Sequence, residues 1–277
     1  MAEDSKIEWT DHTFNPWTGC TKVSPGCDHC YAESWAKRSG HVLWGNHDRK
    51  RTTEAYWRTP FTWEDRAHRF FREHDRRQRV FCASLADVFD NQAPQAWRDD
   101  LFALIRRTPS LDWLVLTKRP QNIRKMLPSD WGGGYDNVWL GTTAEDQARY
   151  DQRWPHLAAT PAAVRFISYE PAIGPLRLAT SGLQPDWLID GGESGGKARD
   201  HDPKWTREIQ RDCADRGVAF FLKQWGRYAN NPLVREHGLS IAEAKARDEH
   251  GKGGCLLDGR LYRAFPMPRE RRAIAAE

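Results

Sequence analysis

The sequence has few cysteines and no long apolar run. Its 277 residues include six cysteines, too few for a disulfide scaffold, and clustered thiols in a reducing compartment are more often metal ligands than bridges. No segment approaches the roughly 18 apolar residues that cross a bilayer. The first residues also lack the charged-then-apolar pattern of a signal peptide. We therefore expect a soluble, cytoplasmic protein that does not associate with a membrane.

The sequence also lacks the common nucleotide-binding loops. Its most glycine-rich segment, Gly191 to Gly196, reads Gly-Gly-Glu-Ser-Gly-Gly, without the Gly-x-Gly-x-x-Gly spacing or the Gly-Lys-Ser/Thr ending of phosphate-binding loops. Glycines do allow the backbone to approach a ligand closely. We expect such an approach here, with Glu193 as the side chain that touches the ligand.

The net charge is only +4, but basic residues are concentrated in one segment. Residues 49–79 contain ten Lys or Arg against five Asp or Glu, with six aromatic residues interleaved. This pattern fits phosphate contact and base stacking on a nucleic acid. It also fits an amphipathic helix from Thr62 to Arg76, whose apolar face carries Trp63 and Phe70 while its charged face meets solvent. The sequence leaves both interpretations open.

After residue 78 the sequence alternates short apolar runs with longer helical patterns. The runs are too short and too uniformly apolar for half-exposed hairpin strands, so buried parallel strands fit best. They are Val80 to Leu85, Trp113 to Thr117, Val138 to Gly141, Val164 to Ser168, Trp187 to Asp190 and Val218 to Leu222. Alternating strands and helices predict an α/β fold whose parallel sheet is either open or curled into a barrel.

The same alternation predicts the domain organisation. We expect a single domain over residues 1–225, because no Pro/Gly/Ser-rich linker interrupts the alternating region. Residues 41–78 form a helical, basic and aromatic insertion, and residues 226–277 form an irregular C-terminal extension. Cys82 and Cys213 fall on apolar patterns, so we expect both to be buried as small hydrophobic residues.

Polar side chains follow the predicted strands. Parallel α/β folds place their sites at the carboxyl ends of the strands, where such side chains would meet. Any one of them can be a helix cap or a solvated charge, but their recurrence at successive strands favours a site. The candidate residues are Asp87, Lys118, Thr142, Glu170 and Glu193.

Three cysteines, Cys20, Cys27 and Cys30, lie together before the alternating region. Three thiolates from one loop can hold a metal ion or a cluster while one coordination position stays open. A structural zinc site would take a fourth protein ligand, from His12, from His29 or from the distant Cys255. An iron–sulfur cluster held by three thiolates would instead leave one iron for a small molecule.

The cysteine segment resembles a known signature. Cys27-Asp-His-Cys30 is similar to the second half of the cysteine motif of the radical S-adenosylmethionine (SAM) superfamily. More closely, the segments Trp9 to Cys20, Tyr169-Glu-Pro and Gly191-Gly-Glu-Ser-Gly resemble a phage-associated three-cysteine family of radical-SAM-like proteins, over roughly residues 6–228. Six residues rather than three separate the first two cysteines, and the Gly-Gly-Glu element follows a later strand than in the superfamily.

The resemblance implies a partial (β/α) TIM-like barrel, a 4Fe-4S cluster on Cys20, Cys27 and Cys30, and SAM on the fourth iron. It implies reductive cleavage of SAM and hydrogen abstraction from a substrate, with an electron donor such as flavodoxin or ferredoxin in a bacterial host cell. The strand-end residues are assigned to the SAM or substrate site by position, and the catalytic residues stay unknown. The basic insertion makes a nucleotide or nucleic acid the expected substrate. The alternative is a zinc-stabilised nucleic-acid-binding protein without redox chemistry.

Overall fold

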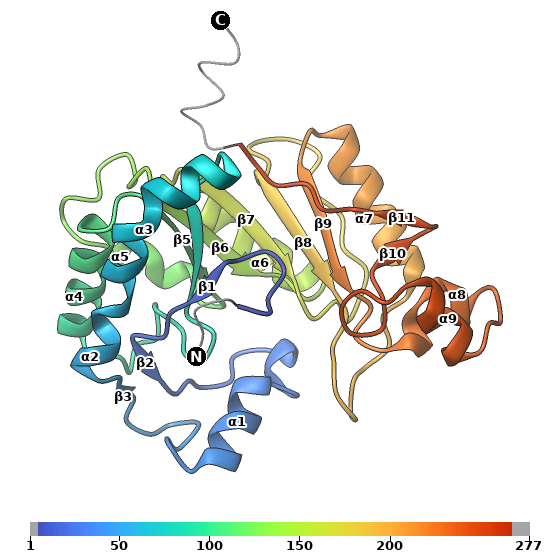
Figure 1. Cartoon of the computed structure of the whole chain (residues 1–277), viewed down its shortest axis with the longest axis horizontal. Helices are drawn as coiled ribbons and strands as arrows, with labels where there is room; N and C mark the ends of the chain where they lie inside the picture. The colour runs from blue at the N-terminus through green and yellow to red at the C-terminus, as the bar shows by residue number, and fades with distance from the viewer. Residues whose placement is uncertain (1–4, 268–277) are drawn as a thin grey trace, which may run out of the picture. The chain divides into compact units, whose positions relative to one another are not determined.

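A computed structural model describes residues 5–267, which form an α/β fold built on a parallel sheet (Figure 1). Its strands, in their order across the sheet, are β1 (His12–Thr13), β4 (Gln78–Cys82), β5 (Leu111–Thr117), β6 (Val138–Thr143), β7 (Val164–Tyr169), β8 (Trp187–Gly191) and β9 (Ala219–Gln224). The seven strands and the helices between them make a partial (β/α) TIM-like barrel. The predicted fold class is confirmed.

The strands follow the apolar runs of the sequence, but several of their ends differ by one to three residues. β4 ends at Cys82, three residues before the predicted end at Leu85, because the Leu85 amide donates to the Asn15 side chain at 2.7 Å and not to a strand. β9 continues to Gln224, two residues beyond the predicted run. β1 was not predicted from an apolar run, since it contains only a histidine and a threonine.

The chain divides into two compact units, Met1–Thr142 with Ala159–Ala163, and Thr143–Ala158 with Val164–Glu277. Each unit is described by itself, and the single domain over residues 1–225 stays a prediction. In the first unit, β4, β5 and β6 are paired in register, with Val80 opposite Trp113 and Trp113 opposite Val138. These side chains are fully buried, which explains the uniformly apolar runs.

Five helices and a small two-stranded sheet complete the first unit within the described residues. They are α1 (Tyr31–Ser39), α2 (Glu54–Trp57), α3 (Thr59–His74), α4 (Gln95–Arg106) and α5 (Ile123–Met126), with β2 (Trp17–Thr18) paired to β3 (Lys50–Arg51). Helix α3 starts three residues before the predicted Thr62, because Pro60 suits a first helical turn. It ends at Asp75, whose φ of 51° is left-handed. Trp63 and Ala67 are buried, as an amphipathic helix requires.

The second unit contains β7, β8 and β9 with Ile167 opposite Leu188 and Ile189 opposite Phe221. Its other elements are α6 (Gln147–Ala158), α7 (Pro203–Asp215), α8 (Pro232–Arg235), α9 (Ile241–Arg247) and the hairpin of β10 (Leu256–Leu257) and β11 (Arg260–Leu261). The chain after β11 returns to β9, where the Leu222 amide donates to the carbonyl of residue 262 at 3.0 Å. Residues 268–277 of the predicted extension lie outside the described residues.

All six cysteines lie in the part of the chain that the structure describes, and none of them forms a disulfide. Cys82 and Cys213 are fully buried, so that prediction is confirmed. Between residues 5 and 267, no helix combines the length and the apolar character needed to cross a bilayer.

Candidate cysteine-loop site

The cysteine loop lies beside the chain segment that leaves β4. The Gly19 amide donates to the Leu85 carbonyl at 3.0 Å, and Gly19 also forms a parallel bridge with Ala86. Gly19 has a φ of 104°, and a side chain there would press against Arg49. Because β4 ends at Cys82, these contacts fix the start of the loop at the carboxyl end of that strand.

The three loop cysteines occupy different local structures. Cys20 directly follows Gly19, Cys27 ends a short 3-10 helix over Pro25–Cys27, and Cys30 caps the N-terminus of α1. Cys27 is buried, while Cys20 and Cys30 are partly exposed.

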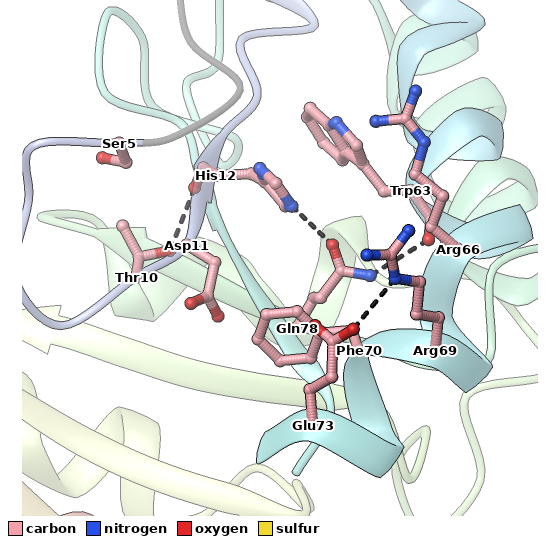
Figure 2. Close-up of a pocket in the computed structure, with 10 residues that line it drawn as sticks. All are labelled: Ser5, Thr10, Asp11, His12, Trp63, Arg66, Arg69, Phe70, Glu73 and Gln78. Carbon is pink, nitrogen blue, oxygen red and sulfur yellow. Dashed lines mark hydrogen bonds and ion pairs between the residues drawn. The ribbon is translucent and has the colours of Figure 1, made fainter.

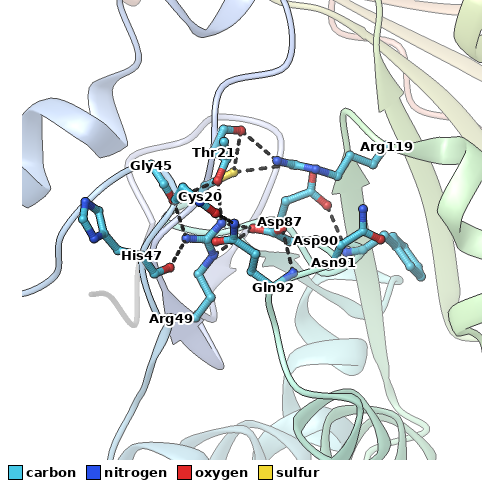
Figure 3. A network of polar contacts seen from close by, with 12 residues as sticks. Cys20, Thr21, Gly45, His47, Arg49, Asp87, Asp90, Asn91, Gln92 and Arg119 are labelled. Atoms are coloured by element: carbon cyan, nitrogen blue, oxygen red, sulfur yellow. Dashed lines mark hydrogen bonds and ion pairs between the residues drawn. The ribbon is translucent and has the colours of Figure 1, made fainter.

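Cys20 contacts a buried arginine–aspartate pair (Figure 3). Nη1 of Arg119 donates to Sγ of Cys20 at 3.5 Å and to Oδ2 of Asp87 at 2.9 Å. Nη2 of Arg119 donates to the carbonyl of Thr21 at 2.7 Å. Arg119 and Asp87 are 5% and 4% exposed. The guanidinium therefore touches the sulfur and holds the backbone of the next residue.

Asp87 is held in place by several donors. Its Oδ1 accepts from the Thr117 hydroxyl at 2.7 Å and from the Phe89 amide at 3.0 Å. Its Oδ2 accepts from the Lys118 amide at 3.1 Å in addition to Arg119. Four donors match the lone pairs of one carboxylate. Asp87 therefore orients Arg119 and joins the ends of β4 and β5 below the cysteine loop.

A second buried pair contacts the same loop (Figure 3). Nε and Nη2 of Arg49 donate to Oδ2 of Asp90 at 2.8 and 2.6 Å. Nη2 also donates to the Thr21 hydroxyl at 2.7 Å, and Nη1 donates to the Gly45 carbonyl at 2.8 Å. Both Arg49 and Asp90 are buried. Thr21 is thus held by two arginines, which limits the movement of the adjacent Cys20.

The surroundings of Cys20 act in opposite directions on its thiol. Burial raises the pKa of Cys20 to about 12, the Asp87 carboxylate raises it as well, and the Arg119 guanidinium lowers it. Burial lowers the pKa of Arg119, but the charges of Asp87 and Cys20 outweigh this and raise it above its usual value. Cys20 is therefore protonated at neutral pH, and a metal or cluster that binds there must displace the proton.

The three loop sulfurs are not gathered around one point. Within residues 5–267, the only group of three or more His, Cys, Asp or Glu ligand atoms that all lie within 4.8 Å of one another is formed by Asp248, His250 and Cys255. Tetrahedral zinc with Zn–S bonds of about 2.3 Å requires sulfurs about 3.8 Å apart. A cluster instead distributes its thiolates over separate irons. Three thiolates from one loop suit a cluster with one open iron, and within residues 5–267 they do not form a ready-made site for a single metal ion.

The structure brings together some of the predicted strand-end residues. In the first unit, Asp87 bonds the amide of Lys118, and Thr142 donates to the Thr117 carbonyl at 2.9 Å at the adjoining strand end. The other two belong to the second unit. There Glu170 lies 2.8 Å from Lys223. Glu193 in turn accepts from Arg199 at 2.7 Å.

Sequence reasoning missed most of the residues that contact the cysteine loop. Arg119 follows Lys118 at a strand end, so its position was visible but its contact with Cys20 was not. Arg49 and Asp90 carried no signal of their own, because Arg49 is one of many basic residues in its segment.

The second unit contains a buried acid–histidine pair at the end of β8. Oδ1 of Asp190 lies 3.5 Å from Nε2 of His201, and that nitrogen is 2.8 Å from the Thr206 hydroxyl. Burial raises the pKa of Asp190 to about 8; a Thr206 hydrogen bond opposes this, and the charge of Glu170 adds to it. Burial lowers the pKa of His201 to about 3. The pair therefore sits neutral, with its proton on Asp190, near pH 7.

Helix α3 contributes to a cavity of about 570 Å³ at the start of β1 and β4 (Figure 2). His12 stacks on Trp63 with ring centroids 4.2 Å apart, and its Nε2 lies 2.6 Å from Gln78 Oε1. Arg66 and Arg69 of α3 line the same cavity. Because Gln78 is the first residue of β4, this cavity and the cysteine loop lie at opposite ends of that strand.

Fold and site together define an α/β protein with a partial (β/α) barrel and a three-cysteine loop at the carboxyl end of β4. The chain belongs to the family described as "Protein of unknown function (DUF5131)", whose model matches residues 4–266. No curated protein matches it. Among solved structures it is similar to a spore photoproduct lyase mutant with bound AdoMet and dinucleoside spore photoproduct, at 12% identity and a TM-score of 0.43. The similarity covers 80% of this chain, which spans 59% of the lyase chain.

Proposed function

We propose that this protein is a radical SAM enzyme that uses an iron–sulfur cluster to cleave SAM and abstract hydrogen from a substrate. The observation that carries the proposal is the attachment of the cysteine loop at Gly19 to the chain leaving β4. Parallel α/β proteins place their active sites at this end of the strands. Three thiolates from one loop, which would leave one iron of a cluster open, support the same proposal. The resemblance of Cys27-Asp-His-Cys30 to the superfamily motif supports the same reading.

The chain's own residues would position the cofactors. Cys20, Cys27 and Cys30 would hold a 4Fe-4S cluster, and Arg119 would orient the Cys20 sulfur and offset part of its thiolate charge. When bound, the cluster and SAM supply the reductive cleavage and the radical chemistry, with electrons from a donor such as flavodoxin or ferredoxin. Asp87 would act through Arg119 as a positioning residue.

The other strand-end residues are proposed to contact SAM or the substrate. Glu170 and Glu193 each lie beside a cation, at Lys223 and Arg199, and their side-chain oxygens can also accept hydrogen bonds from an amino or hydroxyl group. Thr142 offers a hydroxyl at the end of β6.

Anaerobic reconstitution tests the proposed function. We expect the protein to take up iron and sulfide in equal amounts and to form 5′-deoxyadenosine from SAM after reduction with dithionite. Cys27→Ala should abolish both, because it removes a ligand. Cys213→Ala is the matched control, since it also removes a buried cysteine but on α7 of the second unit. Stoichiometric zinc that survives anaerobic purification in place of iron would contradict the proposal.

We further propose that the substrate is a nucleotide or nucleic acid that contacts α3. The guanidinium groups of Arg66 and Arg69 are exposed beside the cavity (Figure 2). Arg69 is paired with Glu73 at 2.9 Å. Such an exposed pair is screened by water and therefore weak, so a phosphate can replace the glutamate.

Binding measured over a salt series tests this substrate class. We expect a single-stranded oligonucleotide to bind more weakly as salt rises, because phosphate contacts release counterions. Replacing Arg66 and Arg69 by alanine should reduce the slope of log K against log salt by about 1.5, for two lost contacts. The control replaces Arg124 and Lys125, two exposed cations on α5. If the wild-type protein does not bind the oligonucleotide at low salt, α3 is not a phosphate-contacting surface.

A further inference from the structure

A second set of metal-ligand side chains lies in the C-terminal part of the second unit, and it uses none of the loop cysteines. A carboxylate oxygen of Asp248, a ring nitrogen of His250 and the sulfur of Cys255 all lie within 4.8 Å of one another. Oδ1 of Asp248 is 3.8 Å from Nδ1 of His250. Asp248 and Cys255 are fully buried, while the His250 side chain is 57% exposed.

The loop between Asp248 and Cys255 is shaped to bring these residues together. Asp248 directly follows α9, and Cys255 directly precedes β10. Gly253 and Gly254 have φ values of 83° and 81°. A Cβ atom at Gly254 would overlap the Asp248 carboxylate, and one at Gly253 would overlap the backbone of residue 227. Glycine is therefore required at both positions for this close approach.

The Asp248 carboxylate is oriented by groups around it. Oδ2 accepts from Asn231 Nδ2 at 3.0 Å and from the Leu256 amide at 2.8 Å. Oδ1 accepts from the Cys255 amide at 3.0 Å. An ionised carboxylate has about four lone pairs, so Oδ1 retains one that can bind a cation. Such outer hydrogen bonds are typical of carboxylates that ligate metals.

The Cys255 sulfur also contacts a cation, since Nη2 of Arg263 lies 3.2 Å from Sγ of Cys255. Two acidic ligands inside the fold are more stable when a cation shares the site.

We propose that Asp248, His250 and Cys255 bind one Zn²⁺ ion, with water as the fourth ligand. A thiolate, an imidazole and a carboxylate together suit zinc, whereas calcium and magnesium prefer oxygen ligands alone. Tetrahedral zinc places its oxygen and nitrogen ligands roughly 3.3 Å apart. The Asp248–His250 separation of 3.8 Å therefore needs a small movement, which the exposed His250 ring can make. The ion would tie the end of α9 to the start of β10.

Zinc counting on the full-length protein tests this site. The protein is loaded with zinc, freed of excess, and titrated with a chromophoric chelator. We expect His250→Ala to lose one equivalent of zinc, or to bind it at least tenfold more weakly, relative to wild type. His250 is exposed, so this variant should fold normally. His237→Ala, an exposed histidine of the same unit, is the matched control and should retain the full amount.

Two further variants separate this site from the cysteine loop. Cys27→Ala should keep the equivalent of zinc that His250→Ala loses, because it changes only the loop. Cobalt substitution gives a second readout, because a thiolate bound to cobalt produces a charge-transfer absorbance. This absorbance should be weaker in the double variant Cys27→Ala/Cys255→Ser than in Cys27→Ala alone. Equal zinc content in His250→Ala and wild type would overturn the proposal, as would zinc that disappears with Cys27→Ala alone. Neither result depends on SAM cleavage, so the proposed function is tested separately.

Discussion

Replacing Asp87 with alanine is expected to destabilise the protein by about 3–5 kcal/mol, because it leaves the Arg119 guanidinium buried without its counter-charge. Arg119 and Asp87 are almost fully buried and lie 2.9 Å apart. The change also removes the acceptor for the Thr117 hydroxyl and the Lys118 amide. Buried donors that lose their acceptor add to the cost.

Urea unfolding followed by circular dichroism measures this effect. Arg106→Ala is the control, because it removes an exposed pair with Asp130 and should cost no more than about 1 kcal/mol. Replacing Asp87 by leucine and Arg119 by methionine together should recover the part of the loss that comes from the unpaired charge, but not the part that comes from the lost hydrogen bonds. A loss below about 1 kcal/mol for Asp87→Ala would contradict the role given to this pair.

The double replacement also separates stability from function. It keeps the fold but removes the guanidinium that touches Cys20. We expect it to take up iron more slowly than wild type, because the Cys20 proton is harder to displace without the nearby positive charge. If the double variant takes up iron as fast as wild type, Arg119 has only a structural role.

The interior strands were predictable because they are buried on both faces. Trp113 to Thr117 lies within β5, and Trp187 to Asp190 lies within β8. A strand covered on both sides must be apolar at every position, which produces a continuous run in the sequence. β1 lacks such a run because it has two residues, and His12 is satisfied by Gln78 and Trp63, which are distant in sequence.

The candidate site was predictable in position but not in its contacts. A polar residue after an apolar run marks a strand end, so Asp87 and Lys118 were found. The partner of a buried charge depends on tertiary structure, and Arg49 meets Asp90 across 41 residues of sequence. Nothing local distinguishes Arg49 from the solvated arginines of α3. The same holds for His201, whose burial beside Asp190 no pattern around it reveals.

Stability is expected to fall by about 1 kcal/mol between pH 6.5 and 8, because of the buried Asp190–His201 pair. The pKa of Asp190 is raised from 3.8 to about 8, and that of His201 is lowered from 6.5 to about 3. Across this range the native pair holds a proton on Asp190, which it starts to release near pH 8. The unfolded chain releases its last proton, from His201, around pH 6.5. A state that binds more protons is favoured at lower pH, so unfolding becomes easier as pH rises.

Between about pH 4 and 6.5 the same pair should contribute little pH dependence. The native state then carries its proton on Asp190, and the unfolded state carries one on His201, so the two states bind equal numbers. Asp190→Asn removes the native proton site. In that variant only His201 titrates, so its stability should rise up to pH 6.5 and then stay level to pH 8.

Urea unfolding midpoints, measured every half pH unit from pH 4 to 8, distinguish the falling stability of wild type above pH 6.5 from the level stability of Asp190→Asn. The difference between wild type and Asp190→Asn isolates this pair, because the other titrating groups are common to both. Asp215→Asn, an exposed carboxylate on α7, is the control and should follow wild type. Parallel curves for wild type and Asp190→Asn above pH 6.5 would contradict this account, because they would mean that the native pair holds no more protons than the unfolded chain.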